Sequence, residues 1–163
     1  MKLIHRDDQQ LVFRLVSWEK QFLLEVLARY PVLPAKFQTM TRAGVDKTDS
    51  QRECQQLLEE ALAEQKKELR QRLDHFLLEP ERFKPAQKSF DFKLAHSDVE
   101  WFLQILNDIR VGSWYLAGCP EDHQWEKMEL TSDNAIHIFA MEVSGQFQWM
   151  LLQELHGPKQ SEE

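Results

Sequence analysis

The chain has 163 residues, 42% of them hydrophobic and 29% charged, which is the size and composition of one ordered globular domain. Its 20 Lys and Arg residues against 27 Asp and Glu residues give a net charge of -7, which disfavours binding to phosphate backbones. No uncharged stretch approaches the roughly 18 residues of a membrane span, so we expect a cytoplasmic protein that binds neither nucleic acid nor membranes.

The first half of the chain predicts a hairpin and two helices. Two runs rich in Leu, Ile, Val and Phe flank a polar turn at 7–10, which is typical of a β-hairpin over residues 1–16. Ser17 is expected to cap a first helix that ends at Pro31. After an irregular connection, a capping-box pattern at 50–53 begins a long helix that ends before Pro80. Its apolar stripe consists of Cys54, Leu58, Ala61, Leu62, Leu69, Leu73 and Phe76.

The second half predicts one strand and two more helices. Alternating apolar residues favour a third strand near 90–94, which we expect to pair with the hairpin. A second capping-box pattern at 97–100 begins a third helix, which Gly118 and Pro120 close. The last helix begins at Ser132 or Asp133 and ends at Gly157.

These elements together predict a mainly α fold. We expect one domain over residues 1–163, resembling a four-helix bundle with a small N-terminal β-hairpin at 1–16. The helical part, with the strand near 90–94, spans 17–157, and residues 158–163 form a flexible tail.

The chain contains no motif of known catalytic chemistry. A glycine-rich phosphate loop, a nucleophile elbow, a His-Glu-x-x-His pair and zinc-ribbon spacing are all missing from the sequence. The closest approach to a metal-ligand cluster is Glu121, Asp122 and His123, for which a solvated acidic loop is the commoner use. Cys54 and Cys119 are interpreted as reduced packing residues, with a disulfide between them the less common alternative. We therefore expect no catalytic residue, metal or cofactor.

Arg110 interrupts the apolar stripe of the third helix. At 100° per residue it falls on the same side as Leu103 and Leu106, so we predict that its guanidinium is buried. A buried guanidinium needs an acid, backbone carbonyls or a bound anion, the anion being the rarer case. Gln65 and Arg72 interrupt the stripe of the long helix, and Asn107 lies beside Arg110. We therefore predict one buried polar network, or an anion site, made of Arg110, Arg72, Gln65 and Asn107.

The last helix is apolar around its whole circumference. One face holds Ile136, Phe139, Ala140, Val143, Phe147 and Met150, and the other holds Ile138, Met141, Trp149 and Leu152. Such a helix is either central in its own bundle or covered by a partner. We predict that the second face is a partner interface, with a second copy of the chain the simplest partner. A monomer that buries the helix completely is the equal alternative.

The net negative charge lies entirely at the C-terminal end. From Cys119 onward the chain has nine acids and two bases, Lys127 and Lys159. A solvated acidic rim is the commoner use of such a segment, and a docking surface for a basic partner is the alternative.

Three segments of the chain carry a resemblance to a known family. They read WFLQILNDIRVGSWYL at 101–116, EKQFLLEVLARYP at 19–31 and AMEVSGQFQWMLLQEL at 140–155, and Leu106 to Arg110 is the most specific part. The chain resembles an uncharacterised bacterial family catalogued as domain of unknown function 2017, from which the segment around Trp125 departs. The resemblance implies a small, mainly helical cytoplasmic protein without an assigned activity. Because actinobacterial members are encoded near the Clp protease adaptor, it also implies a link to protein quality control.

The sequence therefore favours a non-enzymatic, cytoplasmic protein-interaction or regulatory domain. The alternative is a small-ligand domain or an enzyme that holds an anionic group at Arg110.

Overall fold

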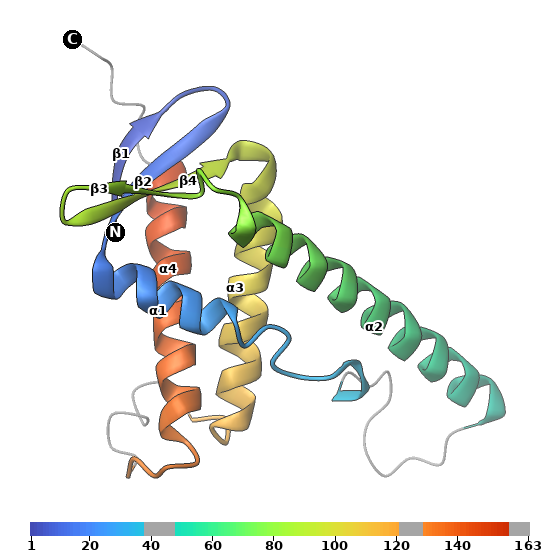
Figure 1. Cartoon of the computed structure of the whole chain (residues 1–163). Helices are drawn as coiled ribbons and strands as arrows, with labels where there is room; N and C mark the ends of the chain where they lie inside the picture. Colours follow the sequence, from blue (N-terminus) through green and yellow to red (C-terminus); the bar gives the residue numbers. More distant parts are fainter. Residues whose placement is uncertain (38–47, 121–128, 157–163) are drawn as a thin grey trace.

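The computed structural model of the chain describes residues 1–37, 48–120 and 129–156 (Figure 1). Within these ranges the chain forms four α-helices, one short 3-10 helix and a four-stranded antiparallel sheet. In chain order the elements are β1 (Lys2–Arg6), β2 (Gln10–Val16), α1 (Ser17–Leu27), η1 (Ala35–Phe37), α2 (Asp49–Leu78), β3 (Phe83–Ala86), β4 (Ser89–Ala95), α3 (His96–Leu116) and α4 (Ala135–His156).

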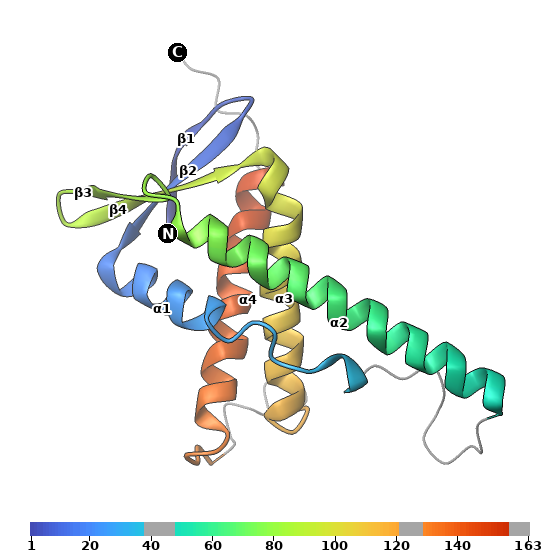
Figure 2. The same cartoon turned by 45° about the vertical axis from the view of Figure 1, so that its right-hand side comes forward.

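The fold is α+β, so the expectation of a mainly α, bundle-like fold is wrong. The hairpin at the N-terminus is confirmed, and so is the third strand with its pairing to that hairpin. The sheet is larger than predicted because β3 adds a fourth strand. In addition, α1 and α2 run across the α3–α4 pair instead of alongside it, so the helices do not form a bundle (Figures 1 and 2).

Two hairpins make the sheet, in the strand order β1-β2-β4-β3. The central pair joins β2 to β4 over their whole length, from Gln10 opposite Ala95 to Val16 opposite Ser89. Its inner face carries Leu11, Phe13 and Leu15 from β2, which are completely buried. The sequence predicted β4 from its period-two alternation and β2 from a run rich in apolar residues beside a polar turn.

The polar turn between β1 and β2 is organised by one carboxylate. Asp7 Oδ1 accepts hydrogen bonds from the backbone N–H groups of Gln9 and Gln10, both at 2.8 Å. These bonds favour the charged carboxylate and lower the pKa of Asp7 to about 2. The carboxylate therefore holds the turn closed at neutral pH.

The ends of the helices differ from the predicted ends by a few residues. Thr48, and not Ser50, caps α2: its Oγ1 accepts from Gln51 N at 3.3 Å, and Gln51 Oε1 accepts from Thr48 N at 2.9 Å. Gly118 follows α3 with φ at +90°, which is the left-handed conformation expected of a residue that terminates a helix. The predicted end at Gly157 and the tail at 158–163 lie outside the described residues.

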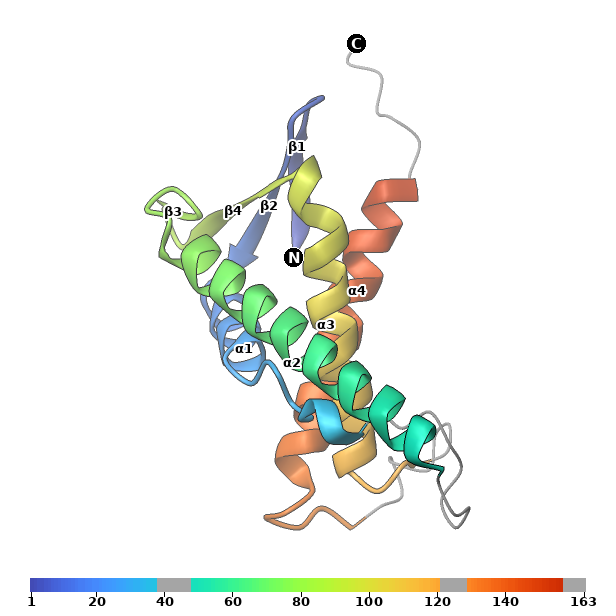
Figure 3. The same cartoon turned by 90° about the vertical axis from the view of Figure 1, so that its right-hand side faces the viewer.

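The core lies between the inner face of the sheet and the four helices (Figure 3). Its centre is a cluster of aromatic rings from α2, β4 and α3: Phe76 lies 6.1 Å from Phe92, 5.2 Å from Trp101 and 5.6 Å from Phe102, between ring centroids. Only the C-terminal part of the predicted α2 stripe reaches this core, through Leu69, Leu73 and Phe76. Cys54 and Ala61 are exposed, and Leu57 is 66% exposed.

The helices of the described residues were also compared with the length and apolarity that a membrane span requires. None of them meets both conditions.

Two glycines in the α3–α4 pair give a first prediction: replacing each with Ala should change the free energy of unfolding in opposite directions. A β-carbon at Gly112 would lie 2.9 Å from Val32 Cβ, which is too close, whereas one at Gly145 would meet only Arg110 Cδ at 3.4 Å. Gly112→Ala should therefore lower the free energy of unfolding by about 1–2 kcal/mol through overpacking. Gly145→Ala should raise it by about 0.5–1 kcal/mol through helix propensity.

Urea denaturation of the two variants and the wild type measures both changes. Equal stabilisation by the two substitutions would show that α3 does not approach the segment after α1 as closely as described.

Candidate functional site

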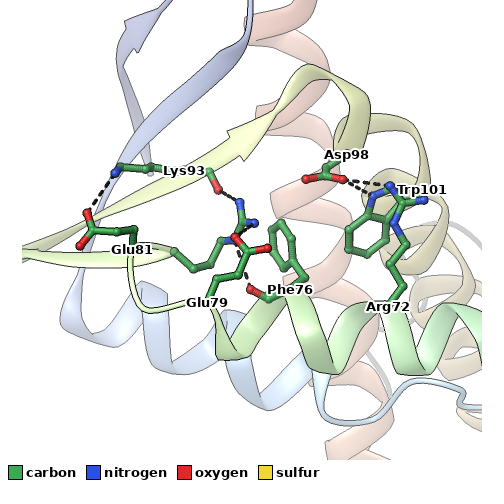
Figure 4. Close-up of polar contacts among 8 residues, drawn as sticks. Arg72, Phe76, Glu79, Glu81, Lys93, Asp98 and Trp101 are labelled. Carbon is green, nitrogen blue, oxygen red and sulfur yellow. Dashed lines mark hydrogen bonds and ion pairs between the residues drawn. The ribbon is translucent and has the colours of Figure 1, made fainter.

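Among the residues that the structure describes, the buried cation is Arg82, in the turn between α2 and β3. Its side chain is 7% exposed, and its guanidinium lies 3.5 Å from the centre of the Phe76 ring. Nε donates to Phe76 O at 3.2 Å, Nη1 donates to Lys93 O at 2.5 Å, and Nη2 pairs with Glu79 Oε2 at 2.5 Å (Figure 4). The guanidinium thus joins the last turns of α2 to β4.

The surroundings of Arg82 act on its pKa in two directions. Burial lowers the pKa of the guanidinium, whereas the carboxylates of Glu79 and Asp98 raise it. A guanidinium stays protonated under these conditions, so the site is a fixed positive charge rather than a titrating group. Because its N–H groups are taken up by the protein, Arg82 has a structural role.

Arg72 makes a second polar contact between α2 and α3. Its Nη2 donates to Asp98 Oδ1 at 2.9 Å, its guanidinium lies 4.5 Å from the Trp101 ring centre, and Trp101 Nε1 donates to the same carboxylate at 2.8 Å (Figure 4). The Arg72 side chain is 49% exposed, so this bridge lies at the protein surface.

The prediction that Arg110 is buried is wrong. The residue is exposed, and its Nη2 donates to Asn107 Oδ1 at 3.0 Å. Arg110 lies at the edge of the buried stripe, where its aliphatic part can lie on Gly145 of α4 while the guanidinium reaches solvent. The contact between Arg110 and Asn107 was predicted. Because the Arg110 guanidinium is exposed, however, it does not require a buried acid, carbonyl or anion.

The predicted polar network of Arg110, Arg72, Gln65 and Asn107 does not form. Arg72 contacts the N-terminal turn of α3, on the side that α2 covers, whereas Asn107 and Arg110 lie toward α4. Gln65 is exposed on α2. The structure therefore provides two separate surface contacts where one buried network was expected.

A partly buried carboxylate lies between α2 and α3. Burial raises the pKa of Asp108, and the positive charge of Lys66 acts against this shift. Burial and Asp108 together raise the pKa of Tyr30 to about 12, and the Tyr30 hydroxyl has no hydrogen-bond partner among the described residues. Lys66 Nζ itself donates to Leu33 O at 2.7 Å. Asp108 is thus a charged group held at an energetic cost.

An aromatic surface lies along the helix pair α3–α4, which runs antiparallel with extensive contact (Figures 1 and 2). Arg110 of α3 lies level with Gly145 of α4, and the two helices are antiparallel. A residue one turn after Gly145 on α4 therefore lies level with a residue one turn before Arg110 on α3. Asn107, Arg110, Val111 and Trp114 of α3 and Trp149 and Leu152 of α4 then form one surface, called here the α3–α4 face. Trp114 is 39% exposed and Trp149 is 57% exposed.

The predicted interface residues of α4 divide into two pairs. Ile138 and Met141 are 6% and 8% exposed, so they belong to the interior of this chain. Trp149 and Leu152 are 57% and 37% exposed and belong to the α3–α4 face. Ile138 and Trp149 lie about three turns apart on the same side of α4, so the burial of this side changes along the helix.

The described residues provide little for metal or thiol chemistry. None of their His, Cys, Asp and Glu side chains form a group of three that could hold a metal ion. Glu121, Asp122 and His123 lie outside the described residues. Cys54 and Cys119 are free and exposed, so the prediction that they are packing residues is wrong.

Comparison with protein-family models, curated proteins and solved structures finds no match to this chain. The resemblance to domain of unknown function 2017 stays a prediction. The case for a function therefore comes from the surfaces themselves.

The environment of Arg82 leads to a second prediction. Arg82→Met keeps the aliphatic part of the side chain but leaves the carbonyls of Phe76 and Lys93 without their donor. We expect the free energy of unfolding to fall by about 2–4 kcal/mol. The matched variant Arg110→Met should change it by less than about 0.5 kcal/mol, because Arg110 is exposed.

Guanidinium denaturation of both variants measures this difference. A larger loss at Arg110 than at Arg82 would reverse the assignment of the buried cation.

Asp108 leads to a third prediction, on pH dependence. Its pKa is raised in the folded protein, so the unfolded chain releases this proton more readily as the pH rises above the ordinary value of 3.8. Asp108 therefore lowers the stability of the folded state at neutral pH. Asp108→Asn removes the ionisation, and its stability relative to wild type should increase as the pH rises above the ordinary value of 3.8.

Denaturation of wild type and Asp108→Asn at several pH values tests this. A stability difference between the two proteins that does not change with pH would contradict the assignment.

Proposed function

We propose that the protein is a non-enzymatic protein-binding domain and that the α3–α4 face is its binding surface. The observation that carries the proposal is the exposure of Trp114 and Trp149 on either side of Arg110. Trp and Arg are the residue types that contribute most to binding energy at protein interfaces. Large exposed side chains that lie together, instead of singly, mark interaction sites.

The helix pair gives this surface a fixed shape. Trp114 Nε1 donates to Pro120 O at 2.9 Å, which holds the indole ring in one orientation. Val111 is 43% exposed on the next turn of α3, and Gly145 gives α4 no side chain at the level of Arg110. Aromatic side chains that are held in place lose little entropy on binding, which favours affinity.

The partner in this proposal is another protein or a second copy of the chain, in the cytoplasm. A partner in Clp-type protein quality control belongs to the same proposal and rests only on the resemblance to domain of unknown function 2017. The alternative of an anion site at Arg110 loses its basis. That alternative required a buried guanidinium surrounded by further polar groups, and Arg110 is exposed with Asn107 beside it.

Photo-crosslinking tests the surface and supplies the fourth prediction. Benzoylphenylalanine replaces Val111, at the centre of the α3–α4 face, in protein produced in its native host. We expect discrete crosslinked products, of twice the chain mass if the partner is a second copy. Trp149→Glu should remove most of these products, because it places a charge among the apolar contacts.

Trp18→Glu is the matched control, since Trp18 is 58% exposed and lies on α1. It should leave the products unchanged. Equal loss in the two variants, or equal products from a probe placed at the exposed Gln71 of α2, would contradict the proposed surface.

A further inference from the structure

The outer face of the sheet is the face opposite the helices, and it carries most of the exposed positive charge of the strands (Figure 3). Directly paired residues of antiparallel strands share a face, so the register assigns Lys2, Arg14, Lys84 and Lys93 to the outer face, together with the carboxylate of Asp91. These four cations are accompanied by two carboxylates, because Glu81, which precedes β3, pairs with Lys93 at 3.2 Å. The face is therefore positive on a chain whose net charge is -7.

One row of charged residues crosses all four strands. Lys2 of β1 lies opposite Arg14 of β2, Arg14 lies opposite Asp91 of β4, and Asp91 lies opposite Lys84 of β3. Asp91 is engaged by Arg14 through both oxygens, with Nε to Oδ1 at 2.9 Å and Nη2 to Oδ2 at 3.2 Å. Among the residues that the structure describes, Lys2 and Lys84 have no ion-pair partner.

This arrangement is unfavourable for the isolated chain. Like charges directly opposite each other destabilise a sheet, and Lys2 faces Arg14 in this way. A carboxylate brought to Lys2 relieves this repulsion. A second carboxylate at the other end of the row gives an ion-pair partner to Lys84, whose neighbour Asp91 is already paired with Arg14.

The spacing of the row defines the partner's geometry. Lys2 and Lys84 are three strand spacings apart, which is about 14 Å. An extended polypeptide covers this distance in about four residues. Apolar contact is available beside the row, because Val16, two residues after Arg14 on β2, shares the outer face and is 40% exposed.

The composition of this face favours a polypeptide over a nucleic acid. The Phe residues of the sheet point to the helix side, where Lys20 of α1 lies 3.8 Å from the centre of the Phe90 ring. Without Phe, Tyr or Trp on the outer face, unpaired bases have no ring of these types on which to stack.

We propose that the outer face of the sheet binds an extended acidic segment of another protein, with carboxylates about four residues apart that pair with Lys2 and Lys84. This surface is separate from the α3–α4 face, so the two proposals can fail independently. Lysines on edge strands also prevent edge-to-edge aggregation, and β1 and β3 are the edges of this sheet. The experiment must separate that role from binding.

Fluorescence anisotropy with a labelled peptide of three Glu-Thr-Val-Ser repeats provides the test. At about 50 mM salt we expect this peptide to bind at least about tenfold more tightly than the same peptide with Gln in place of Glu, and raising the salt should reduce the difference. Lys2→Gln combined with Lys84→Gln should weaken binding about tenfold, and Lys84→Gln alone should have an intermediate effect.

The control is Arg52→Gln combined with Lys67→Gln, which removes the same charge from exposed positions of α2. It should leave the affinity for the Glu peptide unchanged. The proposal is overturned by any of three results: equal affinity for the Gln peptide, equal loss in the control, or aggregation of the Lys2 and Lys84 variants without loss of binding. Tighter binding of a twelve-nucleotide oligouridine than of the Glu peptide would assign the face to nucleic acid and would also overturn it.

Discussion

The buried guanidinium of Arg82 joins the long helix α2 to the sheet. It lies against Phe76, whose ring contacts Phe92 of the sheet and Phe102 of α3, so the cation is placed at the edge of the aromatic core. A guanidinium in such a place must have its donors satisfied, and the carbonyls of α2 and β4 accept them. The contacts that satisfy this one cation therefore tie the C-terminal end of the long helix α2 to β4.

Periodicity accounts for what the sequence predicted about the fold. β4 alternates because one of its faces is buried, β2 is a run rich in apolar residues beside a polar turn, and all four helices carry apolar positions at three- and four-residue steps. β3 escaped prediction because it has only four residues, includes Pro85 and buries neither face completely. The helix stripes also gave no information on crossing angles, which is why a bundle was expected.

The same limit applies to the candidate sites. Helix periodicity placed Arg110 on an apolar side but not its exposure, since that depends on the absence of a side chain at Gly145 of the neighbouring helix. Arg82 lies in a turn, where no periodicity indicates burial. On α4, Trp149 was correctly placed apart from the core, whereas Met141 was not, although the sequence pattern put both residues on one face. Contacts between elements decide burial, and a pattern within one element does not contain them.

The order of strands in the sheet requires β2, which is synthesised early, to pair with β4, which is synthesised much later. Arg14 and Asp91 are paired in the central strands although they are 77 residues apart along the chain. Closing so long a loop costs conformational entropy before any contact compensates for it, and non-local pairing of this kind slows folding. Until β4 has been made, one edge of β2 presents unpaired backbone groups. During synthesis, β1 and β2 are therefore exposed to association with other chains until β4, which follows the long helix α2, has been made.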